Sequence, residues 1–167
     1  MEKILKFQEI NDIAKKLGEC VKSGEVVALV GDLGTGKTTF TKNFAKSFGI
    51  EENLKSPTFN YVLEYFDGKY PLYHFDVYRL SDAEEIYEIG YEDYINSDGV
   101  SLIEWADIIE SELPKEYIEI KLDYADEDSR KISIKYIGNE KKEEELLKNV
   151  GFSNWYMYKN RKRCPSR

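Results

Sequence analysis

The chain has 167 residues, enough for one domain with a buried core. It is acidic, with 24 Lys and Arg against 32 Asp and Glu and a formal net charge of −8, which argues against direct, non-specific binding to nucleic acid, because such binding needs a basic surface. Its two cysteines are too few for a disulfide framework, and no apolar run approaches the roughly 20 residues of a membrane helix. We expect a cytoplasmic protein that does not associate with membranes.

Hydrophobic residues along the chain alternate between helical and strand spacing. Ile10, Ile13, Ala14 and Leu17 recur one turn apart and predict an amphipathic helix. Short runs of Val, Ile and Leu predict buried strands. In the first half of the chain we expect a helix over 10–21, a strand over 25–30, a helix over 39–48, and a hairpin of strands over 59–66 and 70–78. A capping box at Ser81 is expected to begin the next helix, which ends near Gly90. Strands over 100–103, 117–123 and 131–137 follow, and then a last helix over 139–150.

This alternation predicts one domain over residues 1–150. Strands interleaved with helices are typical of an α/β fold, here a three-layer phosphate-loop fold with a mixed, mainly parallel central sheet. Residues 151–167 are basic and aromatic and show no periodicity. Such a tail is typical of a disordered terminus, or of one that packs its aromatic side chains on its own domain. Contact with RNA is the alternative, because aromatic rings stack on bases.

Residues 31–38, Gly-Asp-Leu-Gly-Thr-Gly-Lys-Thr, match the phosphate-binding pattern G-x-x-x-x-G-K-[ST]. The match lies between an expected strand and an expected helix, which is the context that its mechanism requires. Backbone N–H groups of the turn and the helix N-terminus attract phosphate oxygens. Lys37 reaches the β- and γ-phosphates, and the Thr38 hydroxyl coordinates Mg²⁺. The sequence therefore predicts an ATP-binding site built by Gly34, Thr35, Gly36, Lys37, Thr38 and Thr39.

A phosphate loop alone does not distinguish a kinase, a GTPase, an ATPase or a regulatory binder. Most enzymes with this loop carry an acid at the end of a buried strand, where it holds Mg²⁺. Glu104 directly follows such a strand and is the first candidate, and Asp76 is the second. His74, the only histidine, is more typical of a hydrogen-bonded structural residue than of a catalyst. The Asn-Lys-x-Asp motif of guanine specificity is absent, which disfavours GTP.

Four motifs follow one another along the chain: the phosphate loop at 31–39, Ser-Pro-Thr-Phe at 56–59, His-Phe-Asp-Val-Tyr-Arg at 74–79, and Glu104-Trp105. In this order and at these separations they closely resemble the TsaE (YjeE) family, over residues 1–150. The resemblance implies an ATPase that is weak alone and stimulated by its partners, TsaB and TsaD. Together with TsaC, these proteins place a threonylcarbamoyl group on adenosine 37 of tRNAs that read ANN codons. Contact with tRNA is expected only through the complex.

The resemblance also implies roles for the residues that surround the phosphates. Thr38 and Glu104 are expected to hold Mg²⁺. Asp76 is expected to orient the attacking water or to assist the metal. Together with Lys37 at the phosphates, Asp76 and Glu104 form the expected catalytic set, with ATP as substrate and Mg²⁺ as cofactor.

Further residues are expected near the site through the same resemblance. Thr58 lies in a segment like a switch I, where it would sense the γ-phosphate, and His74 lies in a segment like a switch II. Trp105 matches a tryptophan beside the nucleotide, although core packing also explains it. Arg130 matches an arginine that helps to hold the nucleotide, and Asn11 lies in the segment expected near the adenine.

The chain departs from the family pattern at Thr35, where Ala is usual, and in its tail after Gly151. Two other functions stay open. A small-molecule kinase would need an acceptor pocket, usually under an Arg-rich lid, and the sequence shows none. An interaction module that binds ATP without useful hydrolysis would carry the same loop, and only multiple-turnover phosphate release separates it from an ATPase.

Overall fold

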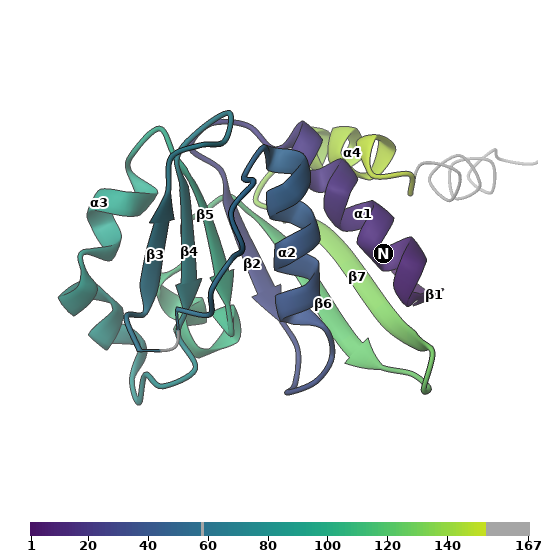
Figure 1. Ribbon diagram of the computed structural model, residues 1–167, viewed down its shortest axis with the longest axis horizontal. Helices are drawn as coiled ribbons and strands as arrows, with labels where there is room; N and C mark the ends of the chain where they lie inside the picture. The colour runs from purple at the N-terminus through teal and green to yellow at the C-terminus, as the bar shows by residue number, and fades with distance from the viewer. Residues whose placement is uncertain (58, 153–167) are drawn as a thin grey trace, which may run out of the picture.

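The structure is a computed structural model that describes residues 1–57 and 59–152. It contains a seven-stranded sheet with the strand order β1-β7-β6-β2-β5-β4-β3 (Figure 1). The strands are β1 (Glu2–Lys6), β2 (Val26–Val30), β3 (Val62–Tyr65), β4 (Leu72–Asp76), β5 (Val100–Glu104), β6 (Tyr117–Tyr124) and β7 (Ser129–Ile137). The helices are α1 (Phe7–Cys20), α2 (Lys37–Phe48), α3 (Tyr91–Ile95) and α4 (Glu140–Asn149), with 3₁₀ segments η1 (Ala83–Ile89) and η2 (Ala106–Glu112).

The predicted three-layer α/β fold with a mixed, mainly parallel sheet is confirmed. The four central strands, β6, β2, β5 and β4, run parallel, and antiparallel strands add to both sides of them. Helices α1, α2 and α4 cover one face, and η1, α3 and η2 cover the other (Figure 1). The parallel centre matters for function, because its strands all end at the same edge of the sheet.

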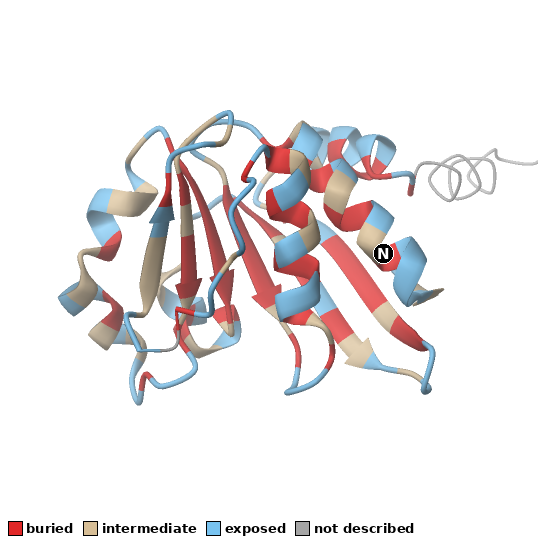
Figure 2. Cartoon of the chain, in the orientation of Figure 1, coloured by how far each residue is buried: buried red, intermediate tan, exposed pale blue. Residues whose placement is uncertain are grey.

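Strand β2 is buried on both of its faces (Figure 2). Val27 and Leu29 belong to the core under α1 and α2, whereas Val26 and Ala28 belong to the core under η1 and η2. A strand covered by both layers needs apolar residues at every position, and this explains its continuous apolar run.

Helices α1 and α2 pack closely against each other, and this contact holds α2 in place behind the phosphate loop. A Cβ at Gly18 of α1 would lie 2.4 Å from the carbonyl oxygen of Phe44 in α2. Only glycine allows this approach. Gly49 ends α2 in the left-handed conformation at φ 101°, as the sequence predicts.

Two sequence expectations need correction. The capping box at Ser81 is wrong: Asp82 is the N-cap of η1, and its carboxylate accepts a hydrogen bond from the Glu84 N–H at 3.2 Å. The strand expected over 59–66 covers only Val62–Tyr65, because Tyr61 adopts a left-handed conformation at φ 62°. The sequence reading also missed β1, α3 and η2, which are short.

No helix within the described residues is long and apolar enough to cross a bilayer. Residues 153–167, and with them most of the basic tail, lie outside the part of the chain that the structure describes.

Candidate functional site

The carboxyl ends of β2, β5 and β4 meet at one edge of the sheet, here called the carboxyl edge. The phosphate loop leaves β2 at this edge, with residues 31–36 between β2 and α2. Glu104 ends β5 and Asp76 ends β4, and the two acids are register partners across the parallel pair. Glu104 is also the register partner of Leu29 in β2. The topology therefore brings the loop and both predicted acids together.

Glycine is required in the loop at two points. At Gly31, a Cβ would lie 2.4 Å from the carbonyl oxygen of Leu122 and 2.7 Å from the Thr35 hydroxyl. Gly36 has φ 105°, in the left-handed region, and is the N-cap of α2. The loop can therefore turn tightly from β2 into α2 and present the helix N-terminus at the carboxyl edge.

A cavity of about 480 Å³ opens at the carboxyl edge. This volume is in the range of small-molecule sites. Most of the residues that the sequence predicts to bind the nucleotide and the metal line this cavity. Its lining consists of Leu33, Gly34, Gly36, Lys37, Thr38, Thr39, Ser56, Asp76, Tyr78, Glu104 and Trp105.

Lys37 is buried at the start of α2. Its Nζ donates to the carbonyl oxygens of Gly31 at 2.5 Å and Asp32 at 2.9 Å, and it lies 3.9 Å from the ring centroid of Trp105. Burial lowers the pKa of the Lys37 ammonium, while the nearby carboxylates, first among them Glu104, oppose that shift. The loop therefore holds a cation beside a cavity that also contains carboxylates.

Glu104 is the most closely held acid of the site, and only 4% of its surface is exposed. Its Oε1 accepts hydrogen bonds from His74 Nε2 at 3.0 Å and from the Thr41 hydroxyl at 3.1 Å. His74 is thus hydrogen-bonded, as expected, and its partner is the candidate metal ligand. The sequence reading missed Thr41, although its position four residues after Lys37 places it on the same side of α2.

Asp76 is half-buried beside Glu104. Burial raises the pKa of its carboxyl group, and the hydrogen bond from the Tyr78 N–H, at 3.0 Å to Oδ1, acts in the opposite direction. Desolvation thus disfavours the charged form of an acid that lines the cavity. A carboxylate perturbed in this way at a ligand site is a candidate for a chemical role.

The donor atoms of the site suit Mg²⁺, which prefers oxygen ligands and usually takes one or two carboxylates together with substrate phosphates. Thr38 offers a hydroxyl and Glu104 a carboxylate, and both line the cavity. Both hydrogen bonds to Glu104 use Oε1, so Oε2 has no hydrogen bond within the described residues. The described residues hold no cluster of three or more His, Cys, Asp or Glu side chains suited to a metal, so a metal here would depend on the phosphates for further ligands.

Trp105 follows Glu104 and has a left-handed backbone at φ 61°, which is uncommon for a residue with a large side chain. Its ring packs on that of Tyr78, with centroids 4.7 Å apart. The indole forms a wall of the cavity and contacts Lys37, so its packing role and its place beside the ligand site coincide.

Thr35 lies in the phosphate loop, but its side chain is buried and does not line the cavity. The hydroxyl donates to the carbonyl oxygen of Asp32 at 2.8 Å. The Thr35 side chain therefore cross-links the loop internally.

Arg130 is buried and lies beside the loop rather than in the cavity lining. One guanidinium nitrogen donates to the carbonyl oxygens of Asp126 and Ser129, both at 2.7 Å, and the other reaches the Gly34 carbonyl oxygen at 3.5 Å. The rings of Phe7 and Tyr124 pack on it, with centroids 4.7 and 4.9 Å from Cζ. This geometry braces the phosphate loop against the β6–β7 turn.

An Arg130→Lys substitution tests this brace. Lysine lacks the planar fork and the stacking surface, so the loop should lose a bond to a charged group, and nucleotide affinity should weaken about tenfold while kcat stays near the wild-type value. Equilibrium titration with a fluorescent ADP analogue measures the change. Lys135→Arg, at an exposed position of the same strand, is the control. Unchanged affinity in Arg130→Lys would show that the loop does not need the brace.

Besides Thr35 and Arg130, one more residue predicted for the nucleotide lies outside the cavity lining. Asn11 lies in α1, outside the cavity lining, and its assignment to the adenine stays a prediction. Thr58 lies outside the described residues.

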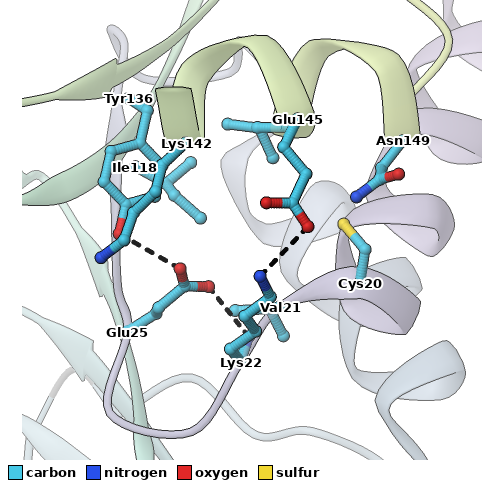
Figure 3. Close-up of a pocket in the computed structure, with 10 residues that line it drawn as sticks. Cys20, Val21, Lys22, Glu25, Ile118, Tyr136, Lys142, Glu145 and Asn149 are labelled. Carbon is cyan, nitrogen blue, oxygen red and sulfur yellow. Dashed lines mark hydrogen bonds and ion pairs between the residues drawn. The ribbon is translucent and has the colours of Figure 1, made fainter. Parts of the chain in front are cut away.

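A second cavity, of about 20 Å³, lies where the end of α1 approaches α4 (Figure 3). Three of its charged side chains are already paired: Glu25 accepts hydrogen bonds from the Tyr136 hydroxyl and the Lys22 N–H, and Lys22 Nζ pairs with Glu145. The volume suffices for about one water molecule. It is not a nucleotide site.

Comparison with known proteins agrees with this geometry. Residues 4–132 match the family model described as threonylcarbamoyl adenosine biosynthesis protein TsaE. A Bacillus subtilis protein named tRNA threonylcarbamoyladenosine biosynthesis protein TsaE is 45% identical over 149 residues, which are 88% of this chain and 93% of that protein. A Haemophilus influenzae protein of the same name is 44% identical over 109 residues, covering 65% of this chain and 68% of the relative.

A solved structure gives the same result. The crystal structure of Bacillus subtilis YdiB aligns with a TM-score of 0.70 and 38% identity, over 92% of this chain and 98% of YdiB. The family model covers most of the chain, including the phosphate loop, both acids of the carboxyl edge and Arg130. The chain belongs to the TsaE family of threonylcarbamoyl adenosine biosynthesis proteins.

Proposed function

We propose that this protein is a Mg²⁺-dependent ATPase that acts with TsaB and TsaD in the threonylcarbamoyladenosine modification of adenosine 37 in tRNAs that read ANN codons. The observation that carries the proposal is the cavity at the carboxyl edge, which combines Lys37, Thr38, Asp76 and Glu104. Its activity is weak alone and stimulated by the partners, and tRNA is contacted through the complex. Because tRNA is matured and used in the cytoplasm, we place the activity there.

Each of the four side chains named above has a role in the proposed reaction. Lys37 places a positive charge where the β- and γ-phosphates bind, and the N-terminus of α2 adds partial charge of the same sign. Thr38 and Glu104 would hold Mg²⁺, which would supply positive charge against the charge that develops on the phosphates. Asp76 accepts a hydrogen bond from the attacking water and orients it.

Two segments beside the cavity would report the nucleotide state to a partner. Ser56 and Tyr78 line the cavity and belong to the segments that resemble switches. ATP and ADP should order these segments differently, as in other phosphate-loop switches. A partner that prefers the ATP-ordered surface must, by linkage, tighten ATP binding by the same factor.

We therefore expect this protein to bind TsaB–TsaD more tightly with a non-hydrolysable ATP analogue than with ADP, by a factor of about 5 to 150. Surface-immobilised TsaB–TsaD, titrated with the protein in each nucleotide state, measures the ratio. Equal affinity in the two nucleotide states would refute the switch model. It would not test the ATPase assignment, which depends on the experiment described next.

Reconstitution of modified tRNA tests the function itself. TsaB, TsaC and TsaD are supplied with tRNA, ATP and the precursors of the threonylcarbamoyl group, with and without this protein. Repeated modification cycles only in its presence support the proposal. Multiple-turnover release of phosphate, measured with and without TsaB–TsaD, separates an ATPase from a module that only binds nucleotide. Modification that proceeds equally without the protein would refute the assignment.

A further inference from the structure

Thr41 is a buried polar residue that no motif in the sequence points to. It lies in α2, one turn after Lys37, and only 1% of its surface is exposed. Its hydroxyl oxygen is 3.1 Å from Glu104 Oε1 and 2.9 Å from the Lys37 carbonyl oxygen. A hydroxyl has one hydrogen and donates to one acceptor at a time. The carboxylate is the stronger acceptor, because hydrogen bonds to charged groups are stronger than those to neutral ones.

His74 supplies the second donor to the same oxygen. Its Nε2 lies 3.0 Å from Glu104 Oε1, and its Nδ1 is buried without a hydrogen-bond partner in the described part of the chain. The proton is therefore assigned to Nε2, since a proton on Nδ1 would leave a buried donor unpaired and would turn a ring lone pair toward the carboxylate. Thr41 and His74 approach Glu104 from different elements, α2 and β4.

Two donors on one oxygen limit the rotation of the carboxylate. The last torsion of a glutamate side chain is broad when nothing restrains it. Here Oε1 is held by Thr41 and His74, while Oε2 is left for a ligand in the cavity that Glu104 lines. The Thr41 contact also connects Glu104 to α2, whose first turn carries Lys37 and Thr38.

We propose that Thr41, together with His74, is a positioning residue that orients the Glu104 carboxylate toward Mg²⁺. The inference rests on the proposed function, because it assigns the metal to Glu104. The inference goes beyond the proposed function because it names the groups that leave one oxygen of the Glu104 carboxylate available to the cation. Thr41 acts through Glu104 and does not line the cavity itself. Groups that orient ligands in this way typically change metal affinity 10- to 100-fold when they are removed.

The experiment measures nucleotide affinity as a function of Mg²⁺, with no requirement for hydrolysis. A fluorescent ADP analogue is titrated into wild type, Thr41→Val and Thr41→Ser, first in EDTA and then at increasing Mg²⁺. Thr41→Val keeps the shape and removes the hydroxyl, so its affinity in EDTA should stay within about twofold of wild type, and the Mg²⁺ concentration for half-maximal tightening should rise about tenfold. Thr41→Ser keeps the hydroxyl and should respond like wild type.

Ser101→Ala is the matched control. Ser101 is buried in β5, three residues before Glu104, and its hydroxyl has no hydrogen-bond partner within the described residues. Its loss should leave the Mg²⁺ response unchanged. The double variant Thr41→Val with Glu104→Gln adds a second test, because a residue that acts only through Glu104 should change nothing further once the carboxylate is gone. If Thr41→Val does not fold, Thr41→Ala removes the same hydroxyl.

The outcomes separate this inference from the function on which it rests. If the nucleotide affinity of the wild-type protein does not change with Mg²⁺, the metal site is refuted, and with it both proposals. If the nucleotide affinity of wild type responds to Mg²⁺ and that of Thr41→Val or Thr41→Ala responds in the same way, only the role of Thr41 is overturned. An equal shift in Thr41→Ser, or in Ser101→Ala, would also overturn it, since packing rather than the hydroxyl would then explain the effect.

Discussion

A Lys37→Met protein is expected to lose ATP hydrolysis by about 10³-fold, because the substitution removes the charge aimed at the phosphates. Nucleotide affinity should fall as well, since the cation contacts the substrate before the reaction. The fold should persist: methionine is one atom shorter than lysine but keeps a flexible apolar side chain that can pack near Trp105, and burial already disfavours the charged ammonium, as its lowered pKa indicates. Multiple-turnover phosphate release and thermal melting together measure the two effects.

The matched control for Lys37 is Lys42→Met, on an exposed face of the same helix. It changes the net charge by the same amount at a position outside the cavity, and its hydrolysis rate should equal that of wild type. Comparable hydrolysis in Lys37→Met and wild type would remove the phosphate-loop assignment altogether. A loss of rate accompanied by a collapse of melting temperature would instead assign Lys37 to the structure of the loop.

The second large effect concerns Asp76. Asp76→Asn should bind nucleotide and Mg²⁺ nearly normally and yet lose turnover by about 10²- to 10⁴-fold, as expected for a group that acts on the attacking water. Its stability should not fall. Burial raises the pKa of Asp76 in the folded protein, so ionisation at neutral pH opposes folding, and a neutral amide that still accepts the Tyr78 N–H removes that opposition.

Glu104→Gln provides the contrast, because glutamine preserves an oxygen for Thr41 and His74 but removes the anion. Its nucleotide affinity should stop responding to Mg²⁺, whereas Asp76→Asn should respond as wild type does. The same titration, of nucleotide affinity against Mg²⁺ concentration, measures the response of both variants. An unchanged response in Glu104→Gln would refute its metal role, and a joint loss of affinity and stability in Asp76→Asn would make Asp76 structural.

Much of the fold could be predicted from local patterns. The apolar run of β2, the helical spacing in α1 and the turn between β3 and β4 are each contained within a few neighbouring residues. Strand β1 was missed for the opposite reason. Its sequence, Glu-Lys-Ile-Leu-Lys, is short and charged, and it is a strand because it pairs antiparallel with β7, more than a hundred residues away.

The amino-acid sequence was sufficient to predict the phosphate loop, its place between strand and helix, and the two acids that follow strands, because each is a local pattern. The groups that surround Glu104 could not be predicted in this way, because they come from distant parts of the chain. Thr41 and His74 lie 63 and 30 residues from it, and Arg130 lies 96 residues from the Gly34 carbonyl that it reaches. Such hydrogen bonds form only when strand order and helix packing bring their partners together. A sequence pattern specifies the elements, but the packing of those elements selects which polar groups meet.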